Sequence, residues 1–160
     1  MMQSPPRPPL PARLSALGVI ACLAWTAVAM PAKAQTPALA SGHWRTADGA
    51  TIVEIKPCAQ TLCGRLVWVR EGADARDERN PDRSRRSAPI CGLNVFSRFR
   101  YEGGRWSGGS IYDPEAGEAI AGVSLGARGD ALTLTVGRGL FAGSETWRRV
   151  PSPARSCQAG

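Results

Sequence analysis

Hydrophobic and polar residues alternate along most of the chain beyond residue 40, with the period of two that is typical of β-strands. Leu132, Leu134 and Val136, for example, fall on one parity, and Thr133 and Thr135 fall on the other. Turn signals rich in glycine separate such segments about every eight to twelve residues. The pattern predicts eight strands, near residues 42–46, 51–57, 62–70, 91–101, 105–113, 118–126, 131–138 and 143–149.

Eight antiparallel strands in sequence order leave two unpaired edges unless the sheet closes on itself. We therefore predict an all-β fold, an eight-stranded antiparallel up-and-down barrel. The interior of such a barrel is filled by side chains or holds one small ligand. Apolar residues at alternating strand positions are the candidate ligand-binding residues: Trp68, Val95, Phe99, Ile111 and Val123. Small side chains that we expect to leave room for a cavity are Gly108, Ser110, Ala119 and Ala121.

The N-terminal residues have the three parts of a cleavable secretory signal peptide. Arg7 and Arg13 precede the uncharged run Leu14–Met30, and an A-x-A cleavage site follows at Ala32-Lys33-Ala34. The prediction is a cleaved signal peptide over residues 1–34, a single β-barrel domain over residues 35–160, and an exported protein, periplasmic or secreted.

Two alternatives to cleavage are an uncleaved membrane anchor and a lipoprotein modified at Cys22. The apolar run is at the short end of the roughly 17–25 residues that a membrane-spanning helix needs, and the small residues behind it favour cleavage. We expect no stable membrane insertion after cleavage.

Removal of residues 1–34 also changes the charge of the chain. Of the 160 residues, 126 remain, and the formal net charge falls from +7 to +4 because Arg7, Arg13 and Lys33 are lost. This charge keeps a domain soluble and gives little reason to expect a polyanionic partner. We therefore expect no nucleic-acid partner, and the oligomeric state stays open.

The four remaining cysteines are Cys58, Cys63, Cys91 and Cys157. An even number in a small exported domain predicts disulfides, with three alternative connectivities. Cys58 and Cys63 flank a predicted tight turn and can meet across it, which leaves Cys91 with Cys157. The sequence predicts no metal site, because it has no C-x-x-C and its one histidine, His43, is far from the cysteines.

The segment 71–89 interrupts the regular spacing of strands. It carries nine charges of both signs between Asp74 and Arg86 and no large apolar side chain. We interpret it as a solvated crossover loop. Alternatives are a calcium site, with Asp74, Asp77, Asn80 and Asp82 as ligands, and a phosphate contact through Arg83, Arg85 and Arg86.

We expect neither an enzyme nor a cofactor. The one histidine, His43, lies beside Trp44 in a predicted strand, and oxidised cysteines lack the thiolate that catalysis requires. Asp113, Glu115 and Glu118 cluster at a turn, but Asp-Pro followed by Gly is ordinary turn chemistry.

Several motifs together resemble an exported bacterial family catalogued as domain of unknown function 2147. They are Gly42-x-Trp44, Asp48-Gly49, Val53-Glu54-Ile55, Cys63 through Trp68, Asn80-Pro81-Asp82, Pro89 through Leu93, Trp106 through Pro114, Gly117, Leu132-Thr133-Leu134 and Thr146-Trp147-x-Arg149. The resemblance covers nearly all of the chain beyond the signal peptide. It implies a small barrel similar to lipocalins, in the bacterial envelope, with no established activity.

Gly42-x-Trp44 also resembles the opening signature of lipocalins, in which an arginine of the last strand covers the tryptophan. Arg149, or alternatively Arg148, would be that cover. Two positions depart from the family pattern. Ala119-Ile120 stands where the family has an aromatic residue after the glycine, and the strand ending around 137–139 differs.

The leading functional hypothesis is a lipocalin-like protein of the cell envelope that binds a small, partly apolar ligand inside its barrel. The alternative is a structural or interaction protein of the envelope with a filled barrel and no ligand.

The A-x-A motif predicts where the exported protein begins. We expect N-terminal sequencing or intact-mass measurement to place the first residue at Gln35. A lipidated Cys22 at the N-terminus, or a retained Met1, would contradict this prediction.

Overall fold

The computed structural model describes residues 37–137, 139, 142–155 and 157. The predicted signal peptide, its cleavage site and the alternative lipid anchor at Cys22 lie outside these residues. Within the described ranges, no helix is long and apolar enough to cross a membrane.

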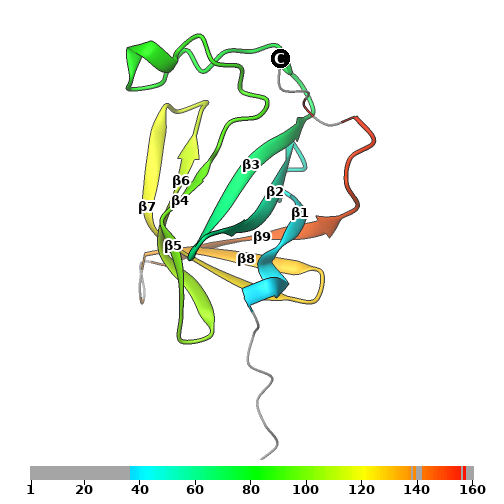
Figure 1. Ribbon diagram of the computed structural model, residues 1–160, viewed down its shortest axis with the longest axis vertical. Helices are drawn as coiled ribbons and strands as arrows, with labels where there is room; N and C mark the ends of the chain where they lie inside the picture. The colour runs from blue at the N-terminus through cyan, green and yellow to red at the C-terminus, as the bar shows by residue number, and fades with distance from the viewer. Residues whose placement is uncertain (1–36, 138, 140–141, 156, 158–160) are drawn as a thin grey trace, which may run out of the picture. The chain divides into compact units, whose positions relative to one another are not determined.

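The described chain forms a closed antiparallel β-barrel (Figure 1). Its strands are β1 (Gly42–Arg45), β2 (Thr51–Cys58), β3 (Thr61–Val69), β4 (Phe96–Ser97), β5 (Phe99–Glu102), β6 (Arg105–Asp113), β7 (Glu118–Arg128), β8 (Ala131–Val136) and β9 (Gly143–Val150). The sheet runs in the order β4-β6-β5-β3-β2-β1-β9-β8-β7, and the additional pairing of β6 with β7 closes it. The short strand β4 pairs only with β6, and β3 pairs with β5. The predicted eight-stranded barrel is therefore confirmed.

The fourth strand differs most from its prediction, whereas the ends of the others are within about two residues of theirs. The predicted strand 91–101 is divided into β4 and β5 by Arg98, whose φ of 60° places it in the left-handed region. The kink puts both Phe96 and Phe99 in the buried core, although they are three residues apart. Regular alternation would have sent one of these two rings outside.

Half of the barrel interior is filled by aromatic rings that lie over glycines. A Cβ atom at Gly64 would overlap the ring of Phe96, and one at Gly109 would overlap the ring of Phe99. The two rings contact each other, with their centroids 5.0 Å apart. Glycine is required at both positions because the rings occupy the space of the missing side chains.

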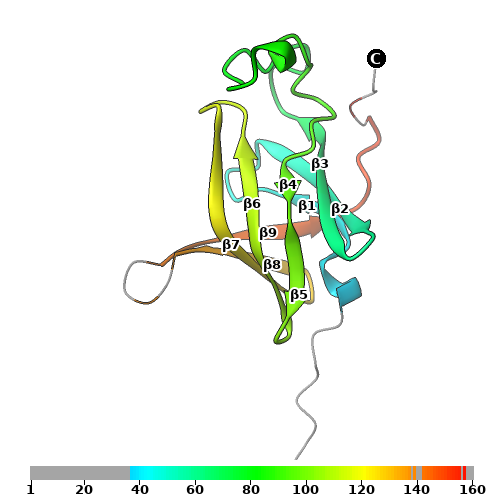
Figure 2. The same ribbon diagram turned by 60° about the vertical axis from the view of Figure 1, so that its left-hand side comes forward.

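This filled end of the barrel is closed by the segment before β1. The short 3-10 helix η1 (Pro37–Ala40) lies at the end opposite the 71–89 segment (Figure 2). The indole of the fully buried Trp44 donates to the carbonyl of Ala40 at 2.8 Å. Arg149 of β9 lies over that indole, with its guanidinium carbon 4.1 Å from the ring centroid, as the sequence predicted. Its two terminal nitrogens donate to the carbonyls of Ser41 and Leu39.

A bulge in β3 decides which residues of that strand face the barrel interior. Ile52 pairs with Trp68 and Val53 pairs with Leu66, so Val67 is an extra residue without a partner in β2. Extra residues of this kind leave backbone groups outside the sheet ladder. The carbonyl of Val67 accepts a bond from the N–H of Cys157 instead, at 2.6 Å, and this bond holds the C-terminal segment against β3.

Most residues of the 71–89 segment are exposed, as expected for a surface loop, but two of its polar side chains are buried. Asp77 is completely buried and Asn80 is 9% exposed. The N–H of Asp77 bonds to the carbonyl of Ala88, and Asp82 caps a short 3-10 helix, η2 (Arg83–Arg85). The segment also contacts the turn between β6 and β7, since Arg79 donates to the carbonyl of Glu115 at 2.6 Å.

Two disulfides are present, with the pairing that the sequence favoured. Cys58 bonds to Cys63 across the β2–β3 turn, and Cys91 bonds to Cys157. The first closes a separation of 5 residues and the second a separation of 66 residues.

We expect the longer disulfide to contribute more to stability. On the loop-entropy model, the Cys91–Cys157 crosslink restricts the unfolded chain by about 4 kcal/mol and the Cys58–Cys63 crosslink by about 2 kcal/mol. Denaturant unfolding of the two paired Cys→Ser variants should show this order. An equal loss of stability in both variants would contradict it.

The contact between Arg149 and Trp44 is predicted to be energetically coupled by ~0.5–2 kcal/mol, the range of a cation–π contact. Arg149→Met keeps most of the side-chain volume and removes the charge. A double-mutant cycle with Trp44→Phe, measured by unfolding free energies, should give this coupling. Zero coupling would mean that the guanidinium acts only through its bonds to Leu39, Ser41 and Asp130.

Candidate functional site

The barrel contains a large cavity at the end opposite η1. Its volume is about 1040 Å³, at the upper limit of the roughly 300–1,000 Å³ that is usual for ligand sites. The turns after β1, β3, β6 and β8 surround its opening, which we call the mouth. Its deep walls are formed by buried apolar side chains: Val53, Leu66, Val95, Val123, Leu134 and Trp147.

Three of the five predicted ligand-binding residues line this cavity, namely Val95, Ile111 and Val123. The other two do not. Phe99 is inside the barrel but belongs to the filled half, where its ring covers Gly109. Trp68 is on the outer face, where the guanidinium of Arg45 lies 4.9 Å from its ring centroid. The prediction for Trp68 was wrong because the bulge at Val67 reverses the facing of the residues after it.

The small side chains that were expected to create the cavity point away from it. Ser110 shares a hydrogen bond with Ser97 at an exposed position, and Ala119 and Ala121 are exposed. Gly108 is exposed too, at a second irregularity where β6 has one residue more than β7. The cavity lies beyond the rings of Phe96 and Phe99, where most of the apolar side chains that line the barrel are aliphatic.

The mouth carries exposed apolar side chains. Three large hydrophobic residues are exposed in the described chain, and two of them, Ile120 and Val136, line the cavity. Ile120 belongs to the Ala119-Ile120 pair that departs from the family pattern. The departure therefore lies at the opening of the barrel.

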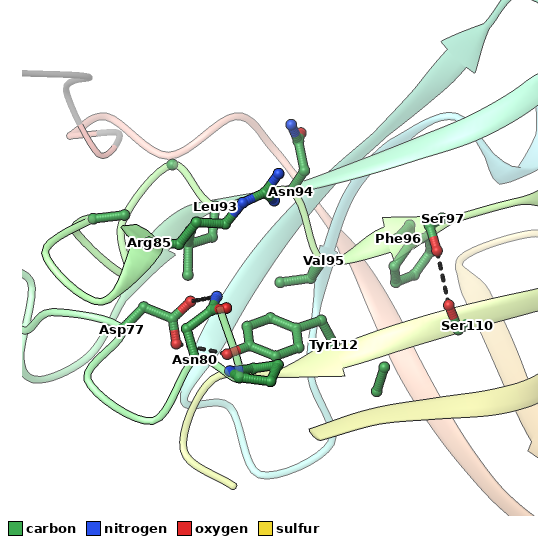
Figure 3. A pocket seen from close by; sticks show the side chains of 14 residues that line it. Asp77, Asn80, Arg85, Leu93, Asn94, Val95, Phe96, Ser97, Ser110 and Tyr112 are labelled. Atoms are coloured by element: carbon green, nitrogen blue, oxygen red, sulfur yellow. Dashed lines mark hydrogen bonds between the residues drawn. The ribbon is translucent and has the colours of Figure 1, made fainter. Parts of the chain in front are cut away.

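A second, smaller pocket of about 460 Å³ lies outside the barrel, between the 71–89 segment and the strands β4 and β6 (Figure 3). Val95 and Tyr112 line both cavities, so they form the wall between them. The hydroxyl of Tyr112 donates to one carboxylate oxygen of Asp77 at 2.7 Å, and the side-chain amide of Asn80 donates to the other.

This arrangement determines the ionisation of the wall tyrosine. Burial, the hydrogen bond to Asp77 and the negative charge of Asp77 raise the pKa of Tyr112 from 10.0 to about 12. The neutral phenol is the form that can donate, and the carboxylate is its acceptor. Tyr112 thus links the 71–89 segment to the barrel wall at neutral pH.

The sequence did not predict the hydrogen bonds that join Asp77, Asn80 and Tyr112. The calcium alternative for Asp77 does not fit, because both of its carboxylate oxygens already accept bonds from protein donors. No group of three metal-ligating side chains occurs within the described part of the chain. The Tyr112-Asp113 motif of the family was the available signal, but nothing in it identifies a partner 35 residues away.

The chain also contains a sequence pattern that marks the catalytic serine in many hydrolases. Gly122-Val123-Ser124-Leu125-Gly126 has the G-x-S-x-G spacing of a hydrolase nucleophile elbow. That elbow requires a sharp strand-to-helix turn, whereas these residues lie within β7. Ser124 pairs with Thr135 of β8, and its neighbours Val123 and Leu125 are the residues buried inside the barrel.

The raised pKa of Tyr112 is directly measurable, because the chain has only two tyrosines. In an alkaline absorbance titration, one phenol should ionise at about pH 12, and Tyr112→Phe should remove that step. Because the unfolded phenol ionises near 10.0, unfolding stability should fall as pH rises between these two values. Asp77→Asn should return the step toward its ordinary value, and an unchanged titration in that variant would contradict the assignment.

Comparison with known proteins agrees with the architecture. Residues 42–149 match the model of a family described as "Uncharacterized protein conserved in bacteria (DUF2147)". Among curated proteins, none is similar in sequence at a significant level. The solved structure of protein HP1028 from Helicobacter pylori, described as belonging to the lipocalin family, is similar at 19% identity and a TM-score of 0.60, over 69% of this chain and 82% of that one. This protein therefore has a lipocalin-like fold and belongs to the DUF2147 family.

Proposed function

We propose that this protein binds one small, partly apolar molecule in the open half of its barrel, in the bacterial cell envelope. The role is binding without catalysis. The observation that carries the proposal is the cavity itself, which is large, concave and lined in its depth by buried apolar side chains. Sites for small molecules usually combine these properties with a few polar groups at fixed places.

The apolar mouth supports the same function. Ile120 and Val136 are 44% and 37% exposed, and both border the opening. Exposed apolar side chains that cluster are a feature of binding surfaces, whereas isolated ones are common on any protein surface. An apolar ligand that enters the barrel would cover them.

The rigid wall beside the cavity also suits a binding role. Tyr112 is fixed by Asp77, and the backbone N–H of Tyr112 bonds to the carbonyl of Val95 at 2.8 Å. A cavity whose wall is held by hydrogen bonds needs little reorganisation when a ligand enters, and this lowers the free-energy cost of binding.

The competing hypothesis is a structural or interaction protein with a solid barrel. The filled half of the barrel fits that hypothesis, and the cavity in the other half counts against it. Export to the envelope is part of the proposal, and it is compatible with two disulfides, which persist in oxidising compartments.

The test fills the cavity and measures binding and stability together. A neutral apolar fluorophore, such as N-phenyl-1-naphthylamine, should bind the wild-type protein with a negative heat-capacity change, because apolar surface leaves water. Val123→Trp places an indole in the empty space, so it should abolish binding while the unfolding free energy changes little. Val123 is suited to this test because it is 1% exposed and lines the cavity.

A matched substitution on the closed side serves as the control. Leu125→Trp, two residues further along the same strand and facing the filled half, should lower stability by about 1–3 kcal/mol through overpacking. If Val123→Trp cost as much stability as Leu125→Trp, and the wild-type protein bound no fluorophore, the barrel would be a solid structural module and the proposal would fail.

A further inference from the structure

The mouth of the cavity has the opposite charge from the rest of the protein. The chain carries 20 Lys and Arg against 13 Asp and Glu. Among the residues that line the cavity, five are acidic and one is basic: Asp48, Glu71, Asp113, Glu115, Glu145 and Arg70. Because the walls are apolar and exclude water, the field of these carboxylates is focused into the opening.

None of the five carboxylates forms an ion pair within the described part of the chain. The ion pairs found there involve Glu54, Asp82 and Asp130, none of which lines the cavity. Arg70, the one lining cation, donates to the backbone carbonyl of Asp48 at 2.7 Å. Hydrogen bonds from the Ala50 N–H and the Thr46 hydroxyl lower the pKa of Asp48, so this carboxylate stays ionised.

One carboxylate lies directly beside an aromatic ring of the cavity wall. The indole N–H of Trp147 donates to Glu145 Oε1 at 2.7 Å, and both residues line the cavity. Trp147 is 5% exposed and is packed against Phe96, with ring centroids 5.9 Å apart. An aromatic ring next to a carboxylate is a suitable site for an alkylammonium group, which is attracted to both.

We propose that the cavity selects a cationic amphiphile, an amine or quaternary ammonium compound whose apolar body fills the aliphatic half of the barrel and whose charged head lies beside Glu145 and Trp147. This inference rests on the proposed binding function and narrows it to a ligand class. A fatty acid or another anionic amphiphile would place its head group among five like charges, so the same cavity discriminates against it.

The experiment compares three probes with one tail and different heads. We choose n-decylammonium, n-decanol and n-decanoate, each below its micelle concentration, as competitors of bound N-phenyl-1-naphthylamine at neutral pH. Decylammonium should bind about tenfold more tightly than decanoate, with decanol between them. The difference should shrink when salt rises from about 0.05 M to about 0.5 M, because exposed charges are screened.

A matched pair of variants assigns the effect to the mouth. Glu145→Gln keeps an oxygen that can accept the Trp147 bond and removes the charge, so it should weaken decylammonium about threefold and leave decanol unchanged. Glu102→Gln makes the same change in net charge on β5, away from the residues that line the cavity, and should change neither affinity.

The outcomes separate this inference from the function on which it rests. If the three probes bound equally, or decanoate bound best, the charge selectivity would be wrong although the cavity still bound apolar tails. If neither the fluorophore nor any probe bound, the binding function itself would be wrong. A loss of decylammonium affinity in both Glu→Gln variants would attribute the effect to net charge and overturn the role of the mouth.

Discussion

The barrel depends on one contact, the guanidinium of Arg149 over the indole of Trp44. Arg149 belongs to β9 and Trp44 to β1, so the contact closes the sheet at the seam between its two ends. The same guanidinium donates to the carbonyls of Leu39 and Ser41, and these bonds hold η1 across the opening. The Arg149 side chain therefore adds to the backbone pairing of β1 with β9 and also fixes the segment that closes one end of the barrel, while the cavity opens at the other end.

The distribution of side-chain volume inside the barrel follows from this seal. Near η1, the rings of Phe96 and Phe99 fit over Gly64 and Gly109 and exclude water. Toward the mouth, valine and leucine are too short to meet across the barrel, and a cavity results. One half of the interior is thus packed and the other half holds a cavity, so we expect substitutions in the two halves to have different consequences for stability.

Much of this architecture follows from the sequence, because alternation and turn residues determine strands locally. The limits of that reasoning are the bulges. At Val67 and Arg98, a backbone irregularity breaks the alternation, so neither the outward facing of Trp68 nor the burial of Phe96 beside Phe99 follows from the sequence pattern. Asp77 illustrates a different limit. The many charges around it in the sequence predicted exposure to solvent. Asp77 is instead buried and accepts a hydrogen bond from Tyr112, a partner that only the tertiary fold brings near.

The seam between β1 and β9 also sets the order in which this molecule can fold. Arg149 and Ser41 are 108 residues apart, so the two strands of the seam come from opposite ends of the barrel sequence. Contacts of this kind are costly in chain entropy and form late, and proteins dominated by them fold in milliseconds to seconds. Until closure, both seam strands present unpaired backbone groups to neighbouring chains. The seam is therefore the place where two copies that have not yet closed their barrels would exchange strands.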